Sequence, residues 1–498
     1  MALFLAGVID KPYPGSKGQG LCEYLWGDQL IMVNNQFSWG NHMSHTKQKM
    51  WCRTIMLWFG IVAGIGLTSS TAQAVPSMAR QTGYECGKCH TVFPELTPFG
   101  RQFKIGAFAM SSDKWDAKPL LERIPVSAAL IGSQTNTSDT SAGGTMPADF
   151  PKDRKVVAET VAVYYGGKIT DNSGALIQYN YDGLEKRWGM EMFDARYGNS
   201  FTLANEELAW GITLNNSPTV SDIYNSTPAW GFPHIGTAAK QMPAATLVDM
   251  TLASKVGGIG LYGQWNNMVY AEVANYRSAK GNAFRPLSWG QQWGSEELAG
   301  SVVKGNAPYW RLALQQDWND HHVAIGTYGL IAKLWQDSND KSLGANRFQD
   351  IAFDANYQYI KGDHSASART TWIREKQTWD SNVVGTSASN ASDTLKTFRA
   401  DFHYYFRRQW GGGLEYFKTT GTSDDLRYNT GDALMGSSNG SPNTKGWIAE
   451  LNYLPWQNVK LALRYTKYDQ FNGASTDYTP GRNASDNNNV FLMGWVLF

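Results

Sequence analysis

The sequence predicts a mainly β protein: a 16-stranded transmembrane β-barrel of the bacterial outer membrane, with a small N-terminal haem c domain acting as its plug. Three observations predict this. Segments of about ten residues alternate apolar with polar side chains, as membrane-spanning strands do. The links between them are alternately short and long, and one Cys-x-x-Cys-His motif lies near the front of the 498-residue chain. A net charge of +1 gives no reason to expect a nucleic-acid partner.

The first expected element is a secretory signal peptide at residues 43–74. Its apolar core, residues 54–67, is preceded by basic residues and followed by an Ala-x-Ala sequence, which predicts cleavage at the end of the segment. A membrane anchor, the alternative, would need about 20 apolar residues. Residues 1–42 show no hydrophobic periodicity, so we interpret them as a gene-model extension and expect translation to start at Met43 or Met50.

The second element is a haem-attachment motif formed by Cys86, Cys89 and His90. The other two of the four cysteines precede the expected cleavage site, so this pair is the whole cysteine content of the mature chain. Thioether bonds to both cysteines would hold one haem c, and His90 would bind the iron from below. A thioredoxin-like pair would need a βαβ context and a zinc site a second pair of ligands, and the surrounding sequence offers neither.

The sixth iron ligand is predicted to be Met110, which follows a short segment containing Pro and Phe after the motif. Ligation by methionine and histidine raises the reduction potential relative to two histidines. Alternatively, Met110 only packs against the porphyrin edge, because methionine commonly fills gaps. Other candidates stay open, namely Met78, Met146, inward-facing methionines farther along, His234, His321, His322, His364 and His403.

The haem domain is expected at residues 75–123. About fifty residues are marginal for a stable hydrophobic core of their own. Haem would supply part of the missing apolar contact, and the barrel wall would supply the rest. We therefore expect this domain to lie within the barrel or at its periplasmic mouth.

The barrel is expected to occupy residues 124–498. Ile351 and Phe353 point to one side of their strand, whereas Asp354 and Asn356 point to the other. A soluble β-sandwich would also alternate, but its strands are shorter. The pattern predicts sixteen strands, at residues 124–134, 156–168, 174–182, 188–197, 205–213, 252–264, 267–277, 307–317, 322–334, 347–361, 365–375, 394–407, 411–419, 445–455, 458–468 and 488–498.

The links between these strands provide an independent indication of a barrel. Outer-membrane barrels have short periplasmic turns and long external loops. The link from Gly183 to Arg187 is the exception, because it is short where a long loop is expected. The clearest brief turns are at residues 266–267, 317–320, 362–364 and 454–457. The longer links, rich in Gly, Ser, Asn and Asp, are 135–155, 214–251, 278–306, 376–393, 420–444 and 469–487.

The C-terminal strand is apolar on both faces. Leu492, Val496 and the terminal Phe498 share one face, which resembles the C-terminal signal of outer-membrane barrels. The opposite, inward face carries Phe491, Met493, Trp495 and Leu497. We therefore expect the inner side of this strand to pack against the haem domain and not against water.

Charged residues on the barrel fall into two groups. Inward-facing residues that would line a solute path in a porin are Arg399, Asp401, Lys460 and Arg464. Acidic residues in the predicted external loops are Asp149, Asp153, Asp424 and Asp425. The acidic residues could attract cations, but solvated loop charges are the simpler interpretation.

The stretch MARQTGYECGKCHTVFPELTPFGRQFKIGAF, residues 78–108, resembles the fused monohaem cytochrome–porins, the outer-membrane iron oxidases of ferrous-iron-oxidising bacteria. The likeness rests on the Ala-Arg-Gln-Thr-Gly run beginning at Ala79, the haem motif, and the Pro-Phe-Gly-Arg and Phe-Lys sequences that end at Lys104. This chain has Met78 where relatives often carry an aromatic residue before Ala-Arg.

The resemblance implies an iron oxidase-type oxidoreductase with one haem c and no catalytic residue beyond the haem. Extracellular Fe²⁺ would reduce the haem by outer-sphere transfer. A periplasmic carrier, such as a small cytochrome or a copper protein, would then accept the electron, and outer-membrane lipid would surround the barrel. Two alternatives stay open, a haem-plugged porin that passes solutes and a protein that exports electrons to an extracellular acceptor.

Overall fold

A computed structural model describes most of the chain after residue 75. The chain divides into two units, residues 1–71 and 72–498, and the predicted extension and signal peptide lie outside the described residues. The described residues are 76–92, 94–119, 123–140, 153–183, 186–224, 226, 244–279, 285–287, 302–337 and 339–498.

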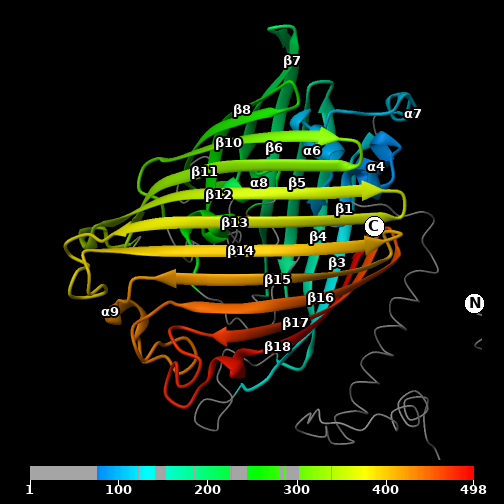
Figure 1. Cartoon of the computed structure of the whole chain (residues 1–498). Coiled ribbons are helices and arrows are strands. Elements are labelled where there is room, and N and C mark those ends of the chain that lie inside the picture. Colours follow the sequence, from blue (N-terminus) through cyan, green and yellow to red (C-terminus); the bar gives the residue numbers. More distant parts are fainter. Residues whose placement is uncertain are drawn as a thin grey trace, which may run out of the picture. The chain divides into compact units, whose positions relative to one another are not determined.

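Sixteen antiparallel strands, β3 to β18, form a closed barrel in which consecutive strands pair and β18 pairs with β3 (Figure 1). The strands are β3 Val126–Thr137, β4 Val156–Thr170, β5 Ser173–Asp182, β6 Arg187–Leu203, β7 Glu206–Asn215, β8 Val256–Trp265, β9 Val269–Ser278, β10 Ala307–Trp318, β11 His321–Trp335, β12 Ala345–Lys361, β13 His364–Thr378, β14 Ser392–Phe406, β15 Trp410–Gly421, β16 Thr444–Trp456, β17 Val459–Gln470 and β18 Asn489–Leu497.

Each of the sixteen predicted strands corresponds to one of these strands, so the predicted barrel and its strand number are confirmed. The largest difference at the end of a strand is in β6, which continues to Leu203 instead of ending near residue 197. Asn199 and Ser200 interrupt the apolar alternation there. Pairing with β7 nevertheless continues through Asn199 opposite Trp210, because the two strands form a long hairpin.

The outer surface of the barrel is apolar. Leu261, Val273 and Leu312 are each more than half exposed, whereas Gln264 and Glu272 on the opposite face are buried. Exposed aromatic rings gather near the short turns, including Trp318, Tyr357, Tyr404, Phe406 and Trp410. An apolar outer band with aromatic residues at its edge matches the hydrocarbon and interfacial layers of a bilayer. The chain therefore forms an outer-membrane β-barrel.

The turns follow the predicted alternation of lengths. Asn266 and Asn267 both adopt positive φ, 50° and 52°, in the three-residue link between β8 and β9. The predicted short link after β5 is also confirmed, since β5 ends at Asp182 and β6 begins at Arg187. The short turns and the C-terminus lie at one end of the barrel (Figure 1), which is the periplasmic end in barrels of this kind.

The N-terminal segment consists of short helices and one small hairpin. Its elements are α4 Pro76–Thr82, α5 Cys86–Cys89, β1 His90–Val92, β2 Glu95–Leu96, α6 Pro98–Ile105 and α7 Asp113–Asp116. Thr97 caps α6 by accepting a hydrogen bond from the Gly100 N–H at 3.1 Å, and Pro98 occupies the first helical turn. Among the described residues no helix is long and apolar enough to cross a membrane.

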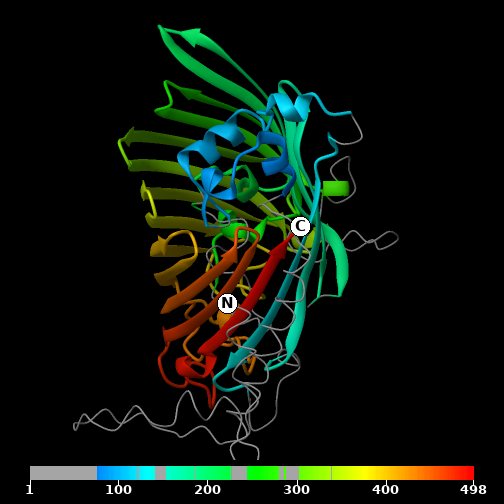
Figure 2. The same cartoon turned by 90° about the vertical axis from the view of Figure 1, so that its right-hand side faces the viewer.

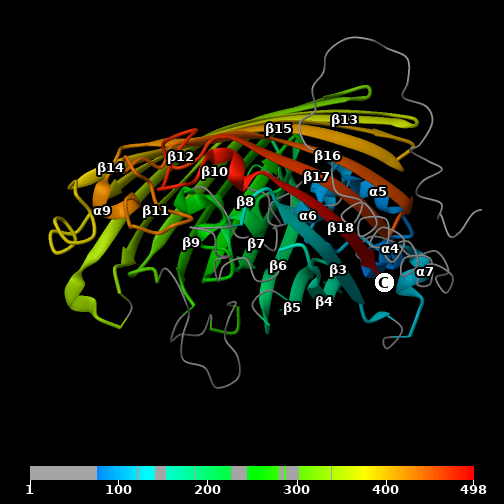
Figure 3. The same ribbon diagram turned by 90° about the horizontal axis from the view of Figure 1, so that it is seen from below.

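These N-terminal elements lie inside the ring of strands at its periplasmic end (Figure 2). Figure 3 shows α5 and α6 between β16 and β17 on one side and β4 to β6 on the other. Two hydrogen bonds illustrate the attachment. The Tyr262 hydroxyl donates to the Ile105 carbonyl at 2.8 Å, and the Arg101 guanidinium donates to the Gln358 side chain at 3.0 Å. Side chains of the segment and of the strands thus bind the two to each other.

The long link between β7 and β8 differs from a simple external loop. Its two described ends form α8 Pro218–Ser221 and the π-helix η2 Leu247–Thr251, which contact the inner faces of β6, β7, β11 and β12. Three residues of this link, Ser217, Ser221 and Thr246, are essentially fully buried. Both ends of the link therefore turn into the lumen and help to fill it.

Candidate functional site

The candidate site is a cavity between the N-terminal segment and the barrel wall. Its lining includes all three residues of the haem-attachment motif, Cys86, Cys89 and His90. Apolar side chains provide much of the remaining wall, namely Met78, Pro94, Leu96, Phe103, Phe108, Leu176 and Met192. The cavity therefore places two thiols and an imidazole at the edge of an apolar space.

Short-range contacts hold the motif at this position. The Thr97 N–H donates to the Cys89 carbonyl at 2.9 Å, and the Thr97 hydroxyl donates to the Lys88 carbonyl at 2.7 Å. The Cys86 N–H reaches the side chain of Gln457, in the turn between β16 and β17, at 3.3 Å. A Cβ on Gly100 would collide with the Cys89 carbonyl, so only glycine allows α6 to approach α5 this closely.

Burial at the cavity favours the uncharged form of three titratable side chains that line it. Burial, with a smaller contribution from Cys86, raises the pKa of the Cys89 thiol to about 11. Burial also lowers the pKa of His90 to about 4, although backbone groups of Glu95 and Pro94 oppose this effect. Lys104 has a pKa lowered to about 8 by burial, against the attraction of Asp194. A neutral imidazole is the form of histidine that binds a metal.

Glu95, five residues after His90, connects the N-terminal segment to the barrel wall. One carboxylate oxygen accepts hydrogen bonds from the Thr91 hydroxyl at 2.7 Å and the Ser367 hydroxyl at 3.1 Å. The other oxygen accepts from the Gln358 amide at 3.2 Å. Glu95 is essentially fully buried, so this network ties the hairpin β1–β2 to β12 and β13. The sequence shows Glu95 only as an acidic residue after the motif and does not indicate this role.

The predicted distal ligand Met110 lies elsewhere. Its side chain is 44% exposed and does not belong to the cavity lining. Two of the methionines left open from the sequence do line the cavity, namely Met78 in α4 and the inward-facing Met192 in β6. The assignment of Met110 stays a prediction, with Met78 and Met192 as its competitors inside the cavity.

The histidine candidates lie outside the cavity lining. His321 and His364 bond to Tyr357 and Tyr404 near the short turns, at 2.8 and 2.6 Å. His403 lies in the lumen beside Asp401, 3.2 Å away. The remaining described candidate, His322, pairs with Asp317 at 3.1 Å. His234 and Met146 lie outside the described residues.

The inner face of the C-terminal strand contacts the N-terminal segment. The inward residues of β18 form one buried apolar cluster with Cys86, Ala129 and Tyr164. Those residues are Phe491, Met493, Trp495 and Leu497, the four predicted from the sequence. The apolar inner face of β18 therefore packs against the motif itself.

The acidic loop residues show structural roles where they are described. Asp424 caps the helix α9 Asp425–Tyr428 and accepts hydrogen bonds from the N–H groups of Ser389 and Asn390. Asp153 is buried and accepts from the Thr137 N–H at 2.9 Å. Asp149 lies outside the described residues. Within the described part of the chain, no group of three or more His, Cys, Asp or Glu side chains could hold a metal ion.

Each of the four inward charged residues forms an ion pair with an oppositely charged side chain. Arg399 makes two bonds to Asp249 of η2, at 2.6 and 3.0 Å. Lys460 and Arg464 both pair with Glu450, at 3.2 and 3.0 Å. Asp401 similarly pairs with Arg369 at 3.0 Å. These side chains lie in the lumen as predicted, where they hold the wall and the inserted segments together.

No protein-family model and no curated protein matches this chain. Among solved structures, the channel DcaP of Acinetobacter baumannii is similar at 12% identity and a TM-score of 0.44, over 75% of this chain and 96% of that one. OmpF of Salmonella typhi is similar at 13% identity and a TM-score of 0.42, over 75% of this chain and 97% of that one. An anion-selective porin from Comamonas acidovorans is similar at 11% identity and a TM-score of 0.39, over 75% of this chain and 98% of that one. The likeness concerns the barrel fold alone. The strand pairing of this chain shows that fold directly.

Proposed function

We propose that the protein carries electrons across the outer membrane through a single haem c held in the N-terminal cavity. On this proposal it oxidises extracellular Fe²⁺ and passes the electron to a periplasmic carrier. The observation that carries the proposal is the placement of Cys86, Cys89 and His90 together at the edge of one apolar cavity. It is also the function that the resemblance to the fused monohaem cytochrome–porins implies.

The residues that line the cavity fit a covalently attached haem c. The thiols of Cys86 and Cys89 would form the two thioether bonds, and His90 would bind the iron. Phe103 and Phe108, which meet edge to face 5.9 Å apart, offer an apolar surface for a flat macrocycle. Bound haem supplies one-electron oxidation and reduction, at a potential set by axial ligand, hydrogen bonding and burial.

The chain's own residues would hold and insulate the cofactor. Lys104, at the cavity wall, donates to the Val220 carbonyl at 2.5 Å and lies 3.6 Å from Asp194, so it fixes a positive charge beside the space. The Glu95 network holds β1 and β2 against the wall. The barrel strands separate the site from lipid, which excludes side reactions with membrane components.

A solute channel is the second candidate, and the barrel itself favours it. A closed barrel of sixteen strands has an interior wide enough for an aqueous channel, and its fold alone requires no cofactor. The N-terminal segment and the inward ends of the β7–β8 link occupy part of this interior. On this reading the plug would gate or stabilise the barrel.

Haem staining of the purified protein and of a Cys86→Ser/Cys89→Ser variant is the first test. We expect covalent haem in the first and none in the second. The oxidised protein is then mixed anaerobically with Fe²⁺ while the haem absorption bands are followed, and reduction within seconds to minutes supports the iron-oxidase function. Absence of haem, or haem that Fe²⁺ does not reduce, contradicts it, while solute flux through liposomes in the same preparation would favour the channel.

A further inference from the structure

Seven consecutive strands, β11 to β17, carry basic side chains at the external end of the barrel. The eight residues, which we call the cationic belt, are Lys333, Arg347, Arg374, Lys376, Lys396, Lys418, Lys445 and Lys467. All of them lie close to the strand ends that are away from the short turns. Seven are exposed, and Lys445 is half-buried.

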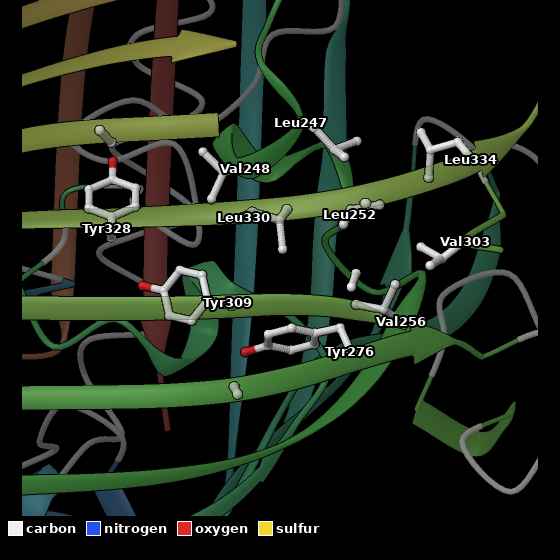
Figure 4. Close-up of a cluster of buried hydrophobic side chains, with 14 of the residues drawn as sticks. Leu247, Val248, Leu252, Val256, Tyr276, Val303, Tyr309, Tyr328, Leu330 and Leu334 are labelled. Carbon is white, nitrogen blue, oxygen red and sulfur yellow. The ribbon is translucent and has the colours of Figure 1, made fainter. Parts of the chain in front are cut away.

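The chain neighbours of these residues show that the cationic belt faces outward. Leu330 and Leu334 of β11 belong to the buried cluster inside the barrel (Figure 4). Successive side chains of a strand point to opposite faces, so Lys333 points away from the lumen. Each other member of the belt also has a buried side chain next to it in the sequence, as Lys376 has in Glu375. The whole belt therefore lies on the surface that faces the membrane and its headgroups.

A row of aromatic rings shows the level of the cationic belt in the membrane. Trp372, Phe398, Tyr416, Trp447 and Tyr465 each lie two residues from a member of the belt, toward the middle of the same strand. The ring centre of Tyr416 lies 4.9 Å from that of Trp447 and 6.3 Å from that of Phe398. Outward aromatic rings of this kind mark the edge of the hydrocarbon layer. Two residues of a strand span about 7 Å, so the belt lies at the level of the lipid headgroups in the outer leaflet.

Strand pairing places like charges of the cationic belt directly opposite one another. The three opposed pairs are Lys333 with Arg347, Arg374 with Lys396, and Lys418 with Lys445. Directly opposite residues have Cβ atoms about 5 Å apart, and like charges at such positions destabilise a sheet. Three such pairs on neighbouring strands indicate that an anion lies between the cations in the membrane.

The protein itself supplies few anions to the cationic belt. Among the described residues, one member of the belt has a carboxylate partner, namely Lys467, which lies 2.7 Å from Asp469. The opposite end of the barrel differs. There the exposed Lys361 and Arg407 pair with Asp320 and Asp363, at 3.0 and 3.1 Å. The excess of positive charge is therefore a property of the external end.

We propose that the cationic belt is a binding site for the phosphate groups of anionic lipids in the outer leaflet. Phosphate oxygens accept charge-assisted hydrogen bonds from Lys and Arg, so one phosphate between two opposed cations relieves their repulsion. Clusters of basic residues beside a membrane attract anionic lipids for the same reason. The acyl chains of such a lipid would pack on the aromatic row, which free phosphate does not do. The site lies on the outside of the barrel, so it does not depend on the electron-transfer function proposed above.

The test uses the full-length protein purified in a neutral detergent. Native mass spectrometry counts bound lipid during titration with lipid A, a glucosamine lipid that carries two phosphate groups, and with the same lipid after both phosphates have been removed. We expect the wild type to bind the phosphorylated lipid more tightly. Lys418→Gln/Lys445→Gln should weaken that binding about tenfold or more, because each basic residue near an anionic lipid contributes several-fold.

A matched control separates the cationic belt from general attraction between charges. Lys361→Gln/Arg407→Gln removes the same number of positive charges at the periplasmic end, and it should bind the phosphorylated lipid as the wild type does. Thermal unfolding without lipid provides a second readout. Lys418→Gln/Lys445→Gln should then unfold at the same temperature as the wild type or a higher one, since it removes an opposed pair.

Each result supports or overturns the proposal. Equal affinity for the phosphorylated and the dephosphorylated lipid, or equal losses of affinity in the two double variants, would overturn it. Displacement of the lipid by inorganic phosphate at the same concentration of phosphate groups would show that the belt takes free phosphate and not lipid. A lower unfolding temperature of Lys418→Gln/Lys445→Gln without lipid would contradict the repulsion on which the proposal rests. None of these results depends on whether the protein carries haem.

Discussion

The Cys89 thiol lies in surroundings that keep it protonated. Burial raises its pKa to about 11, so the folded, haem-free chain holds the proton more tightly than the unfolded chain does. Because the pKa is higher in the folded state, the thiol stabilises the fold fully when the pH is below the unfolded pKa of about 9. This stabilisation is lost as the pH rises from about 9 toward about 11. The thiolate is the reactive form of cysteine, so the same shift slows its reaction with other partners.

We therefore predict slow alkylation of Cys89 in haem-free protein, made by expression without the cytochrome maturation system. At pH 8 the thiolate fraction should be about a hundredfold lower than in the unfolded chain, because the pKa differs by about two units between the two states. Mass spectrometry of iodoacetamide-treated samples with and without urea measures this, and Cys89→Ser identifies the contribution of Cys86. Equal rates in both samples would contradict the prediction.

A second residue-scale prediction concerns the distal iron ligand. Met78 lines the cavity, whereas Met110 is 44% exposed and lies outside its lining. We expect Met78→Leu or Met192→Leu to abolish the charge-transfer band of sulfur ligation in the oxidised protein and to lower the reduction potential, with Met110→Leu unchanged. Loss of the band in Met110→Leu instead would support the assignment made from the sequence.

At the scale of elements, the strands were predictable from the sequence and the inward link was not. Alternation of side chains depends on neighbours within one strand, so each of the sixteen strands carries its own signal. The ends of the β7–β8 link instead depend on contacts made far along the chain, such as Asp249 with Arg399. A Gly-, Ser- and Asn-rich composition marks a loop but does not say whether it turns outward or inward. Met192, likewise, is recognisable as part of the cavity only after β6 and α4 have come together.

The pair between η2 and β14 should stabilise the inward link measurably. Asp249→Ala leaves the partly buried Arg399 guanidinium without the two hydrogen bonds it donates to that carboxylate. We expect a loss of about 2 kcal/mol in the free energy of unfolding, the usual range for hydrogen bonds to charged groups. Urea unfolding in micelles measures it. The exposed pair of Lys361 and Asp320 provides the control, and Asp320→Ala should cost at most about 0.5 kcal/mol.

At the scale of the whole molecule, the N-terminal segment and the barrel complete each other. The segment is only marginally long enough for a stable hydrophobic core of its own. The barrel wall carries buried polar groups that face the segment, including Gln264, Gln358 and Ser367, and each of them bonds to a plug residue. The haem-attachment motif and the apolar inner face of the last strand predicted this association. An apolar inner face would otherwise be exposed to the water of an open pore. The Glu95 network, by contrast, depends on the placement of β2 against β12, which no local pattern encodes.

Removing the plug should therefore open the barrel. We expect a chain lacking residues 76–123 to show a higher ion conductance per molecule in planar bilayers than the full chain. The reason is that the lumen would retain its paired charges and gain water in place of the plug. The full chain and a Cys86→Ser/Cys89→Ser variant are the controls, and the variant separates the effect of the plug from that of haem. Equal conductance with and without the plug would show that the inward link alone closes the lumen.

The packing of β18 against Cys86 has a consequence for biogenesis. The last strand to emerge during synthesis is the one that pairs with the first and closes the seam, and its inner face lies against the motif. Once the seam is closed, maturation enzymes in the periplasm would find the thiols already enclosed by the completed wall. If haem c is bound as proposed, its attachment would therefore precede insertion into the membrane, because the contacts that close the barrel would also end the period in which haem can be added.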